Sequence, residues 1–248
     1  MWGVPDKQTS GITKDTLAYT YQTIKDRAPH CVDKPDSACS LFTIRYPIFK
    51  SAKPLNDLLL KKLIRVSTKD TLINNINSLI GDFFKPYNDF NKHHSNKDIT
   101  YVLNDSIRVL RQDSSLTTLE IKSYEFRGGA HGMNATSFVN WDSKPNKALK
   151  LSDIFKPGYE QQLTKIGETI FRKDEKLSET ASLADDYFFK DAKFSLNENF
   201  LITPLGIKFL YNDYEIKPGA AGQTELLIPY AQIKSLLKPN TVITQYIK

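Results

Sequence analysis

At 248 residues, 40% hydrophobic and 25% charged, the chain is long enough to bury a sizeable core and has the composition of an ordinary globular protein. Its longest apolar stretches, such as 58–60 and 226–228, are far shorter than the roughly eighteen residues that a membrane-spanning helix needs. The net charge of +6 comes from dispersed basic residues, mostly lysine, which argues against nucleic-acid binding. This dispersed positive charge predicts a solvated basic surface with weak affinity for anionic polymers of the cell envelope.

The first part of the chain predicts a hairpin preceded by a tether. Residues 1–15 are polar and lack periodicity, so we expect a disordered leader or tether there. Apolar and aromatic residues then alternate with a period of two over 17–24 and again over 42–48, the pattern of strands with one buried face. The two runs flank a turn-rich segment and therefore predict a wide antiparallel hairpin.

That turn-rich segment contains the two cysteines, Cys31 and Cys39. Pro35 and Asp36 between them favour a reversal that would bring the two Cα atoms near bonding distance. A disulfide closing so short a loop would stabilise the fold by about 2–3 kcal/mol and would persist only in an oxidising compartment. Unrelated thiols, or half of a metal site, are the alternatives, but only four histidines are present to complete such a site. The sequence favours the disulfide and predicts no metal site.

Residues 54–84 carry the clearest helical pattern. Leucines recur every four residues over 55–63, and a second apolar stripe at helical spacing follows. The pattern is interrupted at residues 67–68, and Pro86 is expected to follow its end. The segment therefore predicts an amphipathic helical pair that covers one face of a sheet.

The rest of the chain alternates between strand and helix patterns in blocks. Turn signals between alternating runs predict an antiparallel meander over 99–155. A helix is expected over 159–173, a hairpin over 200–211, a strand over 225–229 and a short helix over 230–237. Because strand runs and helix runs are segregated, the fold class is α+β, with antiparallel hairpins and a meander packed against a few amphipathic helices.

We expect two halves, residues 16–145 and 146–248, that pack as one unit. The sequence contains no exact repeat and no low-complexity tract, and no flexible linker separates the two halves.

The most distinctive string is Gly128-Gly-Ala-His-Gly132. Three glycines in five residues indicate backbone conformations that other residues avoid, or the close approach of another group. No phosphate-binding signature accompanies them. His131 could bind a ligand or transfer a proton near neutral pH, or it could cap the backbone of a hairpin turn, and the turn is the commoner role.

Catalytic signatures are lacking in the sequence. There is no Gly-x-Ser-x-Gly elbow and no His-Glu-x-x-His zinc motif, and neither cysteine has the context of an activated thiol. The sequence therefore predicts no catalytic residue and no cofactor, and it favours binding over catalysis. Aromatic side chains near turns can stack on sugars or anchor a protein partner. The candidate ligand-binding residues are Tyr124, Gly128, Gly129, His131, Gly132, Tyr211, Tyr214 and Glu215.

A set of ordered motifs resembles a known family. The motifs are Tyr124-Glu-Phe-Arg-Gly-Gly-Ala-His-Gly132, Leu149-Lys-Leu-Ser-Asp-Ile-Phe155, Phe200-Leu-Ile-Thr-Pro-Leu-Gly-Ile-Lys-Phe-Leu-Tyr211 and Tyr214-Glu-Ile-Lys-Pro-Gly-Ala-Ala-Gly222, followed by Ile228-Pro-Tyr230. Together they resemble the DUF3298 domain, preceded by a DUF4163-like region of the PdaC deacetylase type. The sequence departs from the pattern at Pro218-Gly219, where an aromatic residue is expected after the proline.

The resemblance implies an extracytoplasmic protein, in the periplasm or at the cell surface. Members of the family occur as lipoproteins, as ectodomains of lysozyme-sensing anti-sigma factors, and beside the separate catalytic domain of peptidoglycan deacetylases. We therefore expect a non-catalytic envelope module, with a lipid anchor in its precursor, that binds cell-wall glycan or a protein partner. The alternatives are a lysozyme-binding, inhibitor-type protein, which the chain's own positive charge disfavours, and a peptidoglycan-acting hydrolase or deacetylase accessory.

Overall fold

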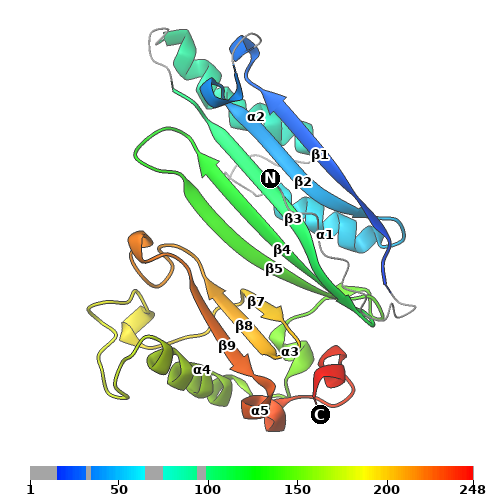
Figure 1. Ribbon diagram of the computed structural model, residues 1–248, viewed down its shortest axis with the longest axis vertical. Helices are drawn as coiled ribbons and strands as arrows, with labels where there is room; N and C mark the ends of the chain where they lie inside the picture. The colour runs from blue at the N-terminus through cyan, green and yellow to red at the C-terminus, as the bar shows by residue number, and fades with distance from the viewer. Residues whose placement is uncertain (1–15, 32–34, 65–74, 94–98, 248) are drawn as a thin grey trace.

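Two sheets lie one beyond the other along the long axis of the computed structural model, which describes residues 16–31, 35–64, 75–93 and 99–247 (Figure 1). The leader expected over residues 1–15 lies outside these ranges. The larger sheet contains β1 (Tyr19–Arg27), β2 (Leu41–Phe49), β3 (Val102–Asp113), β4 (Leu116–Phe126), β5 (Met133–Asp142) and β6 (Lys147–Ala148), side by side in chain order. The smaller sheet contains β7 (Phe200–Ile202), β8 (Gly206–Tyr211) and β9 (Thr224–Pro229).

The pairing of the larger sheet confirms the predicted hairpin and meander, with one difference. β1 pairs antiparallel with β2, and β3 to β6 form an antiparallel meander. The pair β2 and β3 is parallel, which the sequence did not predict. The parallel pairing follows from the helical connection between these strands, because a crossover returns the chain to the edge at which it started.

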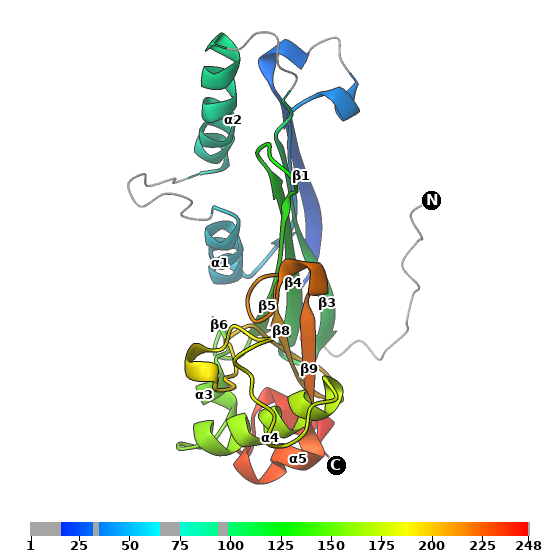
Figure 2. The ribbon, with the colours of Figure 1, turned by 90° about the vertical axis from the view of Figure 1, so that its left-hand side faces the viewer.

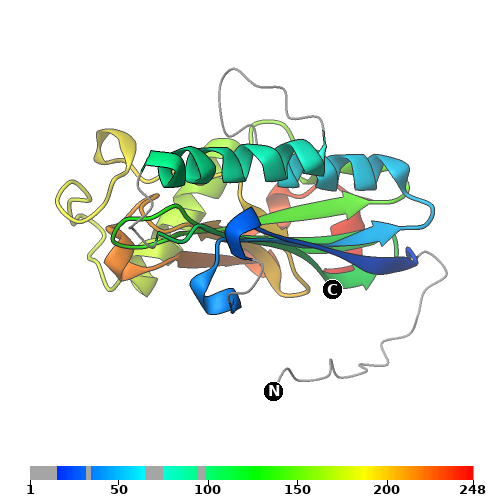
Figure 3. The same ribbon diagram turned by 90° about the horizontal axis from the view of Figure 1, so that it is seen from above.

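The connection contains α1 (Lys53–Leu63) and α2 (Ile76–His93), which lie on the same side of the larger sheet (Figures 2 and 3). The apolar stripe of α1 is fully buried in one core together with Phe42 and Ile44 of β2. The rest of the predicted alternating run over 42–48 is not buried, because Tyr46 is half-buried and Ile48 is exposed. In that core the ring of Phe83 meets the ring of Phe42 edge-on at 5.8 Å between centroids. The predicted helical pair is confirmed, and the break expected at residues 67–68 lies outside the described residues.

The end predicted for the second helix is wrong. α2 continues through Pro86 to His93. A proline within a helix removes one backbone hydrogen bond and is usually costly. Pro86 is exposed, so water can satisfy the carbonyl that loses its donor, and the buried residues Phe83, Phe84 and Tyr87 hold the helix on the core on either side of the proline.

A second core lies between the smaller sheet and its helices. α3 (Leu151–Ile154), α4 (Glu160–Asp174) and α5 (Tyr230–Ile233) belong to this part of the chain, and α4 and α5 contact β9. Gly167 lets α4 approach β9 and the segment before β7 closely, because a Cβ there would lie 3.1 Å from Leu196 and 3.4 Å from Ile228. The predicted helix and the predicted hairpin are confirmed as α4 and as β7 with β8.

Asparagine carboxamides join the two sheets. β6 covers only the end of β5, so the outer edge of β5 would otherwise present unpaired backbone groups. The Asn212 carboxamide accepts from Thr136 N (2.6 Å) and donates to Thr136 O (3.1 Å). The Asn199 carboxamide accepts from Phe138 N (3.1 Å) and also donates to Thr136 O (2.8 Å).

Asn140 makes the reciprocal contact from β5 to β7. Its buried carboxamide donates to Phe200 O and accepts from Ile202 N, both at 2.8 Å. The far end of the meander adds to the same junction, because Tyr246 donates to Asp113 at 2.6 Å. These contacts support the expectation that the two parts pack as one unit. The boundary predicted near residue 145 stays a prediction.

The two cysteines lie close together and are both buried between β1 and β2 in the sequence. Cys31 and Cys39 are thiols in this structure, so the predicted disulfide is not formed here. The Cys39 thiol donates to Cys31 O at 3.8 Å, and burial, followed by a hydrogen bond with Cys39, raises the pKa of the Cys31 thiol. Their proximity agrees with the predicted reversal of the chain.

Replacing Asn140 with alanine tests the joint between the sheets. The change strands Phe200 O and Ile202 N in a buried position, so we expect the free energy of unfolding to fall by about 2–4 kcal/mol. The matched control is Asn134→Ala on the same strand, where the side chain is exposed and the change should be within about 0.5 kcal/mol. Urea unfolding measures both, and equal stability of the two variants would contradict the role of Asn140.

Candidate functional site

The predicted glycine loop connects β4 to β5. Gly128 and Gly129 have φ angles of +82° and +106°, which favour glycine strongly. Gly132 has a different function, because a Cβ there would lie 2.5 Å from the ring of Tyr124. Tyr124 therefore packs so closely on the Gly132 backbone that a side chain has no room there, and this contact joins the loop to β4.

This loop meets a loop of the smaller sheet. The ring of His131 stacks on that of Tyr214 with 6.2 Å between centroids and 16° between planes, and His131 Nε2 lies 3.4 Å from the Tyr214 hydroxyl. The ring of Tyr214 in turn covers Gly219, where a Cβ would lie 2.1 Å from it. The glycine that departs from the family pattern is thus the residue that makes room for Tyr214. His131, Tyr214 and the loop residues around them form what we call the corner.

Two of the predicted residues have structural roles. Tyr211 is 1% exposed, its hydroxyl donates to Ser195 O at 2.7 Å, and burial raises its pKa well above the usual value. Glu215 accepts from Asn197 Nδ2 at 2.7 Å and from Asn212 N at 2.8 Å, which fixes the loop that carries Tyr214. The structure therefore brings the other predicted residues together at the corner, and it places Tyr211 in the core.

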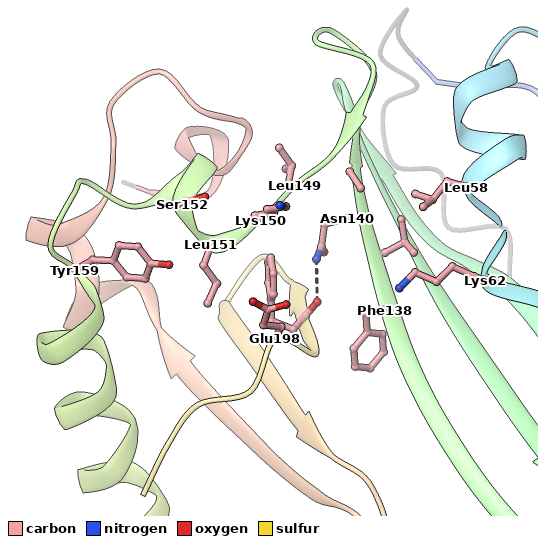
Figure 4. A pocket seen from close by; sticks show the side chains of 13 residues that line it. Leu58, Lys62, Phe138, Asn140, Leu149, Lys150, Leu151, Ser152, Tyr159 and Glu198 are labelled. Atoms are coloured by element: carbon pink, nitrogen blue, oxygen red, sulfur yellow. Dashed lines mark hydrogen bonds between the residues drawn. The ribbon is translucent and has the colours of Figure 1, made fainter. Parts of the chain in front are cut away.

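A cleft that the sequence did not indicate lies between the two parts of the chain (Figure 4). It has a volume of about 320 Å³, in the range of small-ligand sites. Figure 4 shows Lys62 reaching in from α1 on one side and Tyr159, at the start of α4, on the other. The residues that line it are Leu58, Lys62, Phe138, Val139, Asn140, Ala148, Leu149, Lys150, Leu151, Ser152, Tyr159, Glu198 and Phe200.

The cleft combines apolar walls with charges that other groups do not neutralise. Lys62, Lys150 and Glu198 are exposed at its rim, and none of them forms a salt bridge with another described residue. The pKa of Tyr159 is raised by burial and, to a smaller extent, by the nearby carboxylates of Glu160 and Glu198. Its hydroxyl therefore stays protonated and able to donate over the physiological range. Two cations, one anion and an aromatic hydroxyl face a space with apolar sides.

Sequence reasoning missed this cleft because its lining comes from five separated segments. The sequence feature that could have pointed to the cleft is Leu149-Lys-Leu151, where apolar and charged residues alternate at the end of the meander. Among the described residues, no cluster of histidine, cysteine, aspartate or glutamate could hold a metal ion. Within the same residues, no helix is long and apolar enough to cross a membrane.

Comparison with known proteins identifies both parts of the chain. Residues 34–134 match the family described as deacetylase PdaC, and residues 152–231 match the family DUF3298, described as proteins of unknown function. The chain therefore contains a PdaC-like domain followed by a DUF3298 domain, which confirms the resemblance seen in the sequence.

The particular relatives agree with this assignment. Peptidoglycan-N-acetylmuramic acid deacetylase PdaC of Bacillus subtilis strain 168 is 24% identical over 206 residues, which are 81% of this chain and 40% of that protein. The chain thus spans about two fifths of the length of this curated relative. A DUF3298 family member from Bacteroides fragilis NCTC 9343 has a TM-score of 0.73 and 25% identity, covering 94% of this chain and 99% of its own. A DUF3298 family protein from Pseudomonas aeruginosa PAO1 shares the fold, with a TM-score of 0.69 and 24% identity, covering 91% and 96% of the two chains.

Gly219→Ala tests whether glycine makes room for the corner. The new methyl group would overlap the Tyr214 ring, so we expect the ring to move and its stack on His131 to open. The NMR shifts of the His131 ring protons report the stack directly. Gly81→Ala is the control, because no atom lies within 4 Å of its Cβ position and the site is helical. It should leave these shifts unchanged and stabilise α2 by about 0.5–1 kcal/mol, whereas unchanged shifts in Gly219→Ala would refute the packing role.

Proposed function

We propose that the chain is a non-catalytic module of the cell envelope that binds cell-wall glycan in the cleft between its two parts. The cleft carries this proposal, because it is a ligand-sized space that neither part makes alone. The chain matches 40% of a relative that is named as a peptidoglycan deacetylase, which supports a role at the cell wall.

The chemistry of the cleft suits a wall fragment. Phe138 and Tyr159 offer ring surface for the apolar faces of sugars. Lys62 and Lys150 can pair with the free carboxylates of the stem peptides of peptidoglycan. Glu198 can accept from sugar hydroxyls or from a stem-peptide ammonium group. A neutral, fully apolar ligand would leave these three charges without partners and is therefore disfavoured.

Calorimetric titration with soluble peptidoglycan fragments tests the proposal. We expect binding of micromolar strength, which the double variant Lys62→Gln/Lys150→Gln should weaken about tenfold or more, because two charge-assisted contacts are lost. The control double variant is Lys61→Gln/Lys85→Gln, which removes the same charge from exposed helical positions outside the cleft. Equal weakening in both double variants, or no binding by the parent protein, would exclude the cleft as the glycan site.

A protein partner is the second candidate, and the corner favours it. Tyr214 is 56% exposed and Met133 is 70% exposed, and exposed aromatic and methionine side chains are typical anchors of protein interfaces. A lysozyme-type partner would form a stoichiometric complex that Tyr214→Ala abolishes and in which muramidase activity is blocked. The chain's charge of +6 opposes association with a basic lysozyme, so glycan stays the first proposal.

We place the protein outside the cytoplasm, anchored by a lipid in its precursor. The matched deacetylase acts on peptidoglycan by name, and a disulfide between the neighbouring Cys31 and Cys39 would persist in an oxidising compartment. In that compartment the two thiols join in the disulfide that the sequence predicts.

The disulfide can be tested by oxidising the purified protein. We expect the mass to fall by about two hydrogens, alkylation of both thiols to stop, and stability to rise by about 2–3 kcal/mol over the reduced protein. The Cys39→Ala variant is the control, whose stability should not depend on the oxidant. Intact thiols after prolonged mild oxidation would contradict the disulfide.

A further inference from the structure

Among the described residues, α1 and α2 lie on one face of the larger sheet and no α-helix covers the opposite face, which we call the open face (Figure 2). Strand residues alternate between the two faces, so the burial of Phe42, Ile44, Leu103, Ile107, Leu119 and Ile121 against the helices assigns their neighbours to the open face. The register then gives the positions of these neighbours across the sheet.

One row runs straight across five strands. Thr23 is opposite Arg45, Arg45 is opposite Ser106, Ser106 is opposite Lys122, and Lys122 is opposite Thr136. Hydroxyl and cationic side chains therefore alternate from strand to strand. Because strands are about 4.8 Å apart, the backbones that carry the two cations are roughly 10 Å apart. Thr136 is buried at the junction with the smaller sheet, so the exposed part of the row ends at Lys122.

The open face carries an excess of positive charge. Its basic residues over the central part of the sheet are Lys25, Arg27, Arg45, Arg108 and Lys122, and Glu120 lies among them. Farther along β3, Arg111 and Asp113 are on the same face and pair with each other at 3.2 Å. Glu120 pairs with Arg108 at 3.0 Å and with Lys122 at 3.7 Å, so two cations share one carboxylate. At the edge, Lys25 and Arg27 share Asp36 in the same way, at 2.6 Å and 3.7 Å.

Arg45 is the centre of this surface. Its guanidinium lies 3.7 Å from the centroid of the Tyr21 ring, and the Tyr21 hydroxyl accepts from Val109 N at 3.2 Å. The hydrogen bond to β3 fixes the position of the Tyr21 ring, and the ring in turn orients Arg45. Arg45 is exposed and forms no salt bridge with another described residue. An oriented guanidinium without an acidic partner is ready to bind an anion.

We infer that this face is a docking surface for an acidic polysaccharide, a second site that is separate from the cleft. Charge complementarity requires a polyanion, and the alternation of hydroxyls with cations fits a chain of sugars in which carboxylates recur between hydroxyl-bearing units. Thr23 and Ser106 bind sugar hydroxyls, while Arg45 and Lys122 bind carboxylates. The exposed backbone edge of β1 leaves the row open at one end, so a long polymer can extend past the sheet.

Affinity electrophoresis and calorimetry with galacturonic acid oligomers test this inference. We expect binding that disappears with maltose oligomers of equal length, because these lack the carboxylates. The double variant Arg45→Gln/Lys122→Gln should weaken binding at least tenfold and reduce the slope of log affinity against log salt concentration by about 2, one for each cation. Both positions are exposed, and circular dichroism checks that the variant is folded.

The same Lys61→Gln/Lys85→Gln variant serves as control, since it removes equal charge from the helical side of the sheet. It should retain affinity within about twofold. Equal weakening by both double variants would show diffuse attraction to net charge and overturn the surface. Equal or tighter binding of poly(glycerol phosphate), single-stranded DNA or anionic vesicles would overturn the polysaccharide as its ligand. The cleft variant Lys62→Gln/Lys150→Gln should retain galacturonate binding, so failure of either proposed site can be told from failure of the other.

Discussion

The structure depends on the need to satisfy the backbone at one strand edge. β5 ends the larger sheet over most of its length, and β7 begins the smaller one, yet the two strands do not pair directly. Carboxamides fill the gap, because a carboxamide offers a donor and an acceptor in nearly the arrangement of a peptide group. The side chains of Asn199 and Asn212 form hydrogen bonds with the backbone of β5, and the side chain of Asn140 forms hydrogen bonds with the backbone of β7. The two sheets are thus coupled without being merged.

This spacing of the sheets creates the cleft. Direct pairing of β5 with β7 would bring their backbones to about 4.8 Å and leave no room between α1 and the start of α4. The side-chain bridges hold the strands farther apart, so Lys62 and Tyr159 approach a shared space from opposite sides (Figure 4). Any ligand of the cleft would therefore contact both domains and resist their separation, since binding to the joined form alone adds to stability.

Local patterns predicted the elements well, and contacts between distant segments set the limits of prediction. The alternation over 42–48 and the leucine spacing over 55–63 were enough to predict β2 and α1, because burial of one face imposes that period. The gathering of Arg45 and Lys122 in one row depends on the pairing of β2, β3 and β4, which the sequence does not display. Basic residues that are dispersed in sequence were therefore interpreted as a uniform surface. Tyr211 was mistaken for a surface aromatic because it adjoins a turn, although its hydroxyl has a partner inside the core.

The parallel pair of β2 with β3 has a consequence for the order of folding. β3, β4 and β5 are joined by short turns, so their contacts form at little cost in chain entropy. β2 meets β3 only after a crossover that runs from residue 50 to residue 101, and closing so long a loop is slow. The β1–β2 hairpin is therefore expected to join a meander that is already formed. Until then the edge of β3 stays unpaired and vulnerable to association with another chain, which makes the crossover helices, rather than either sheet, the segment on which productive folding depends.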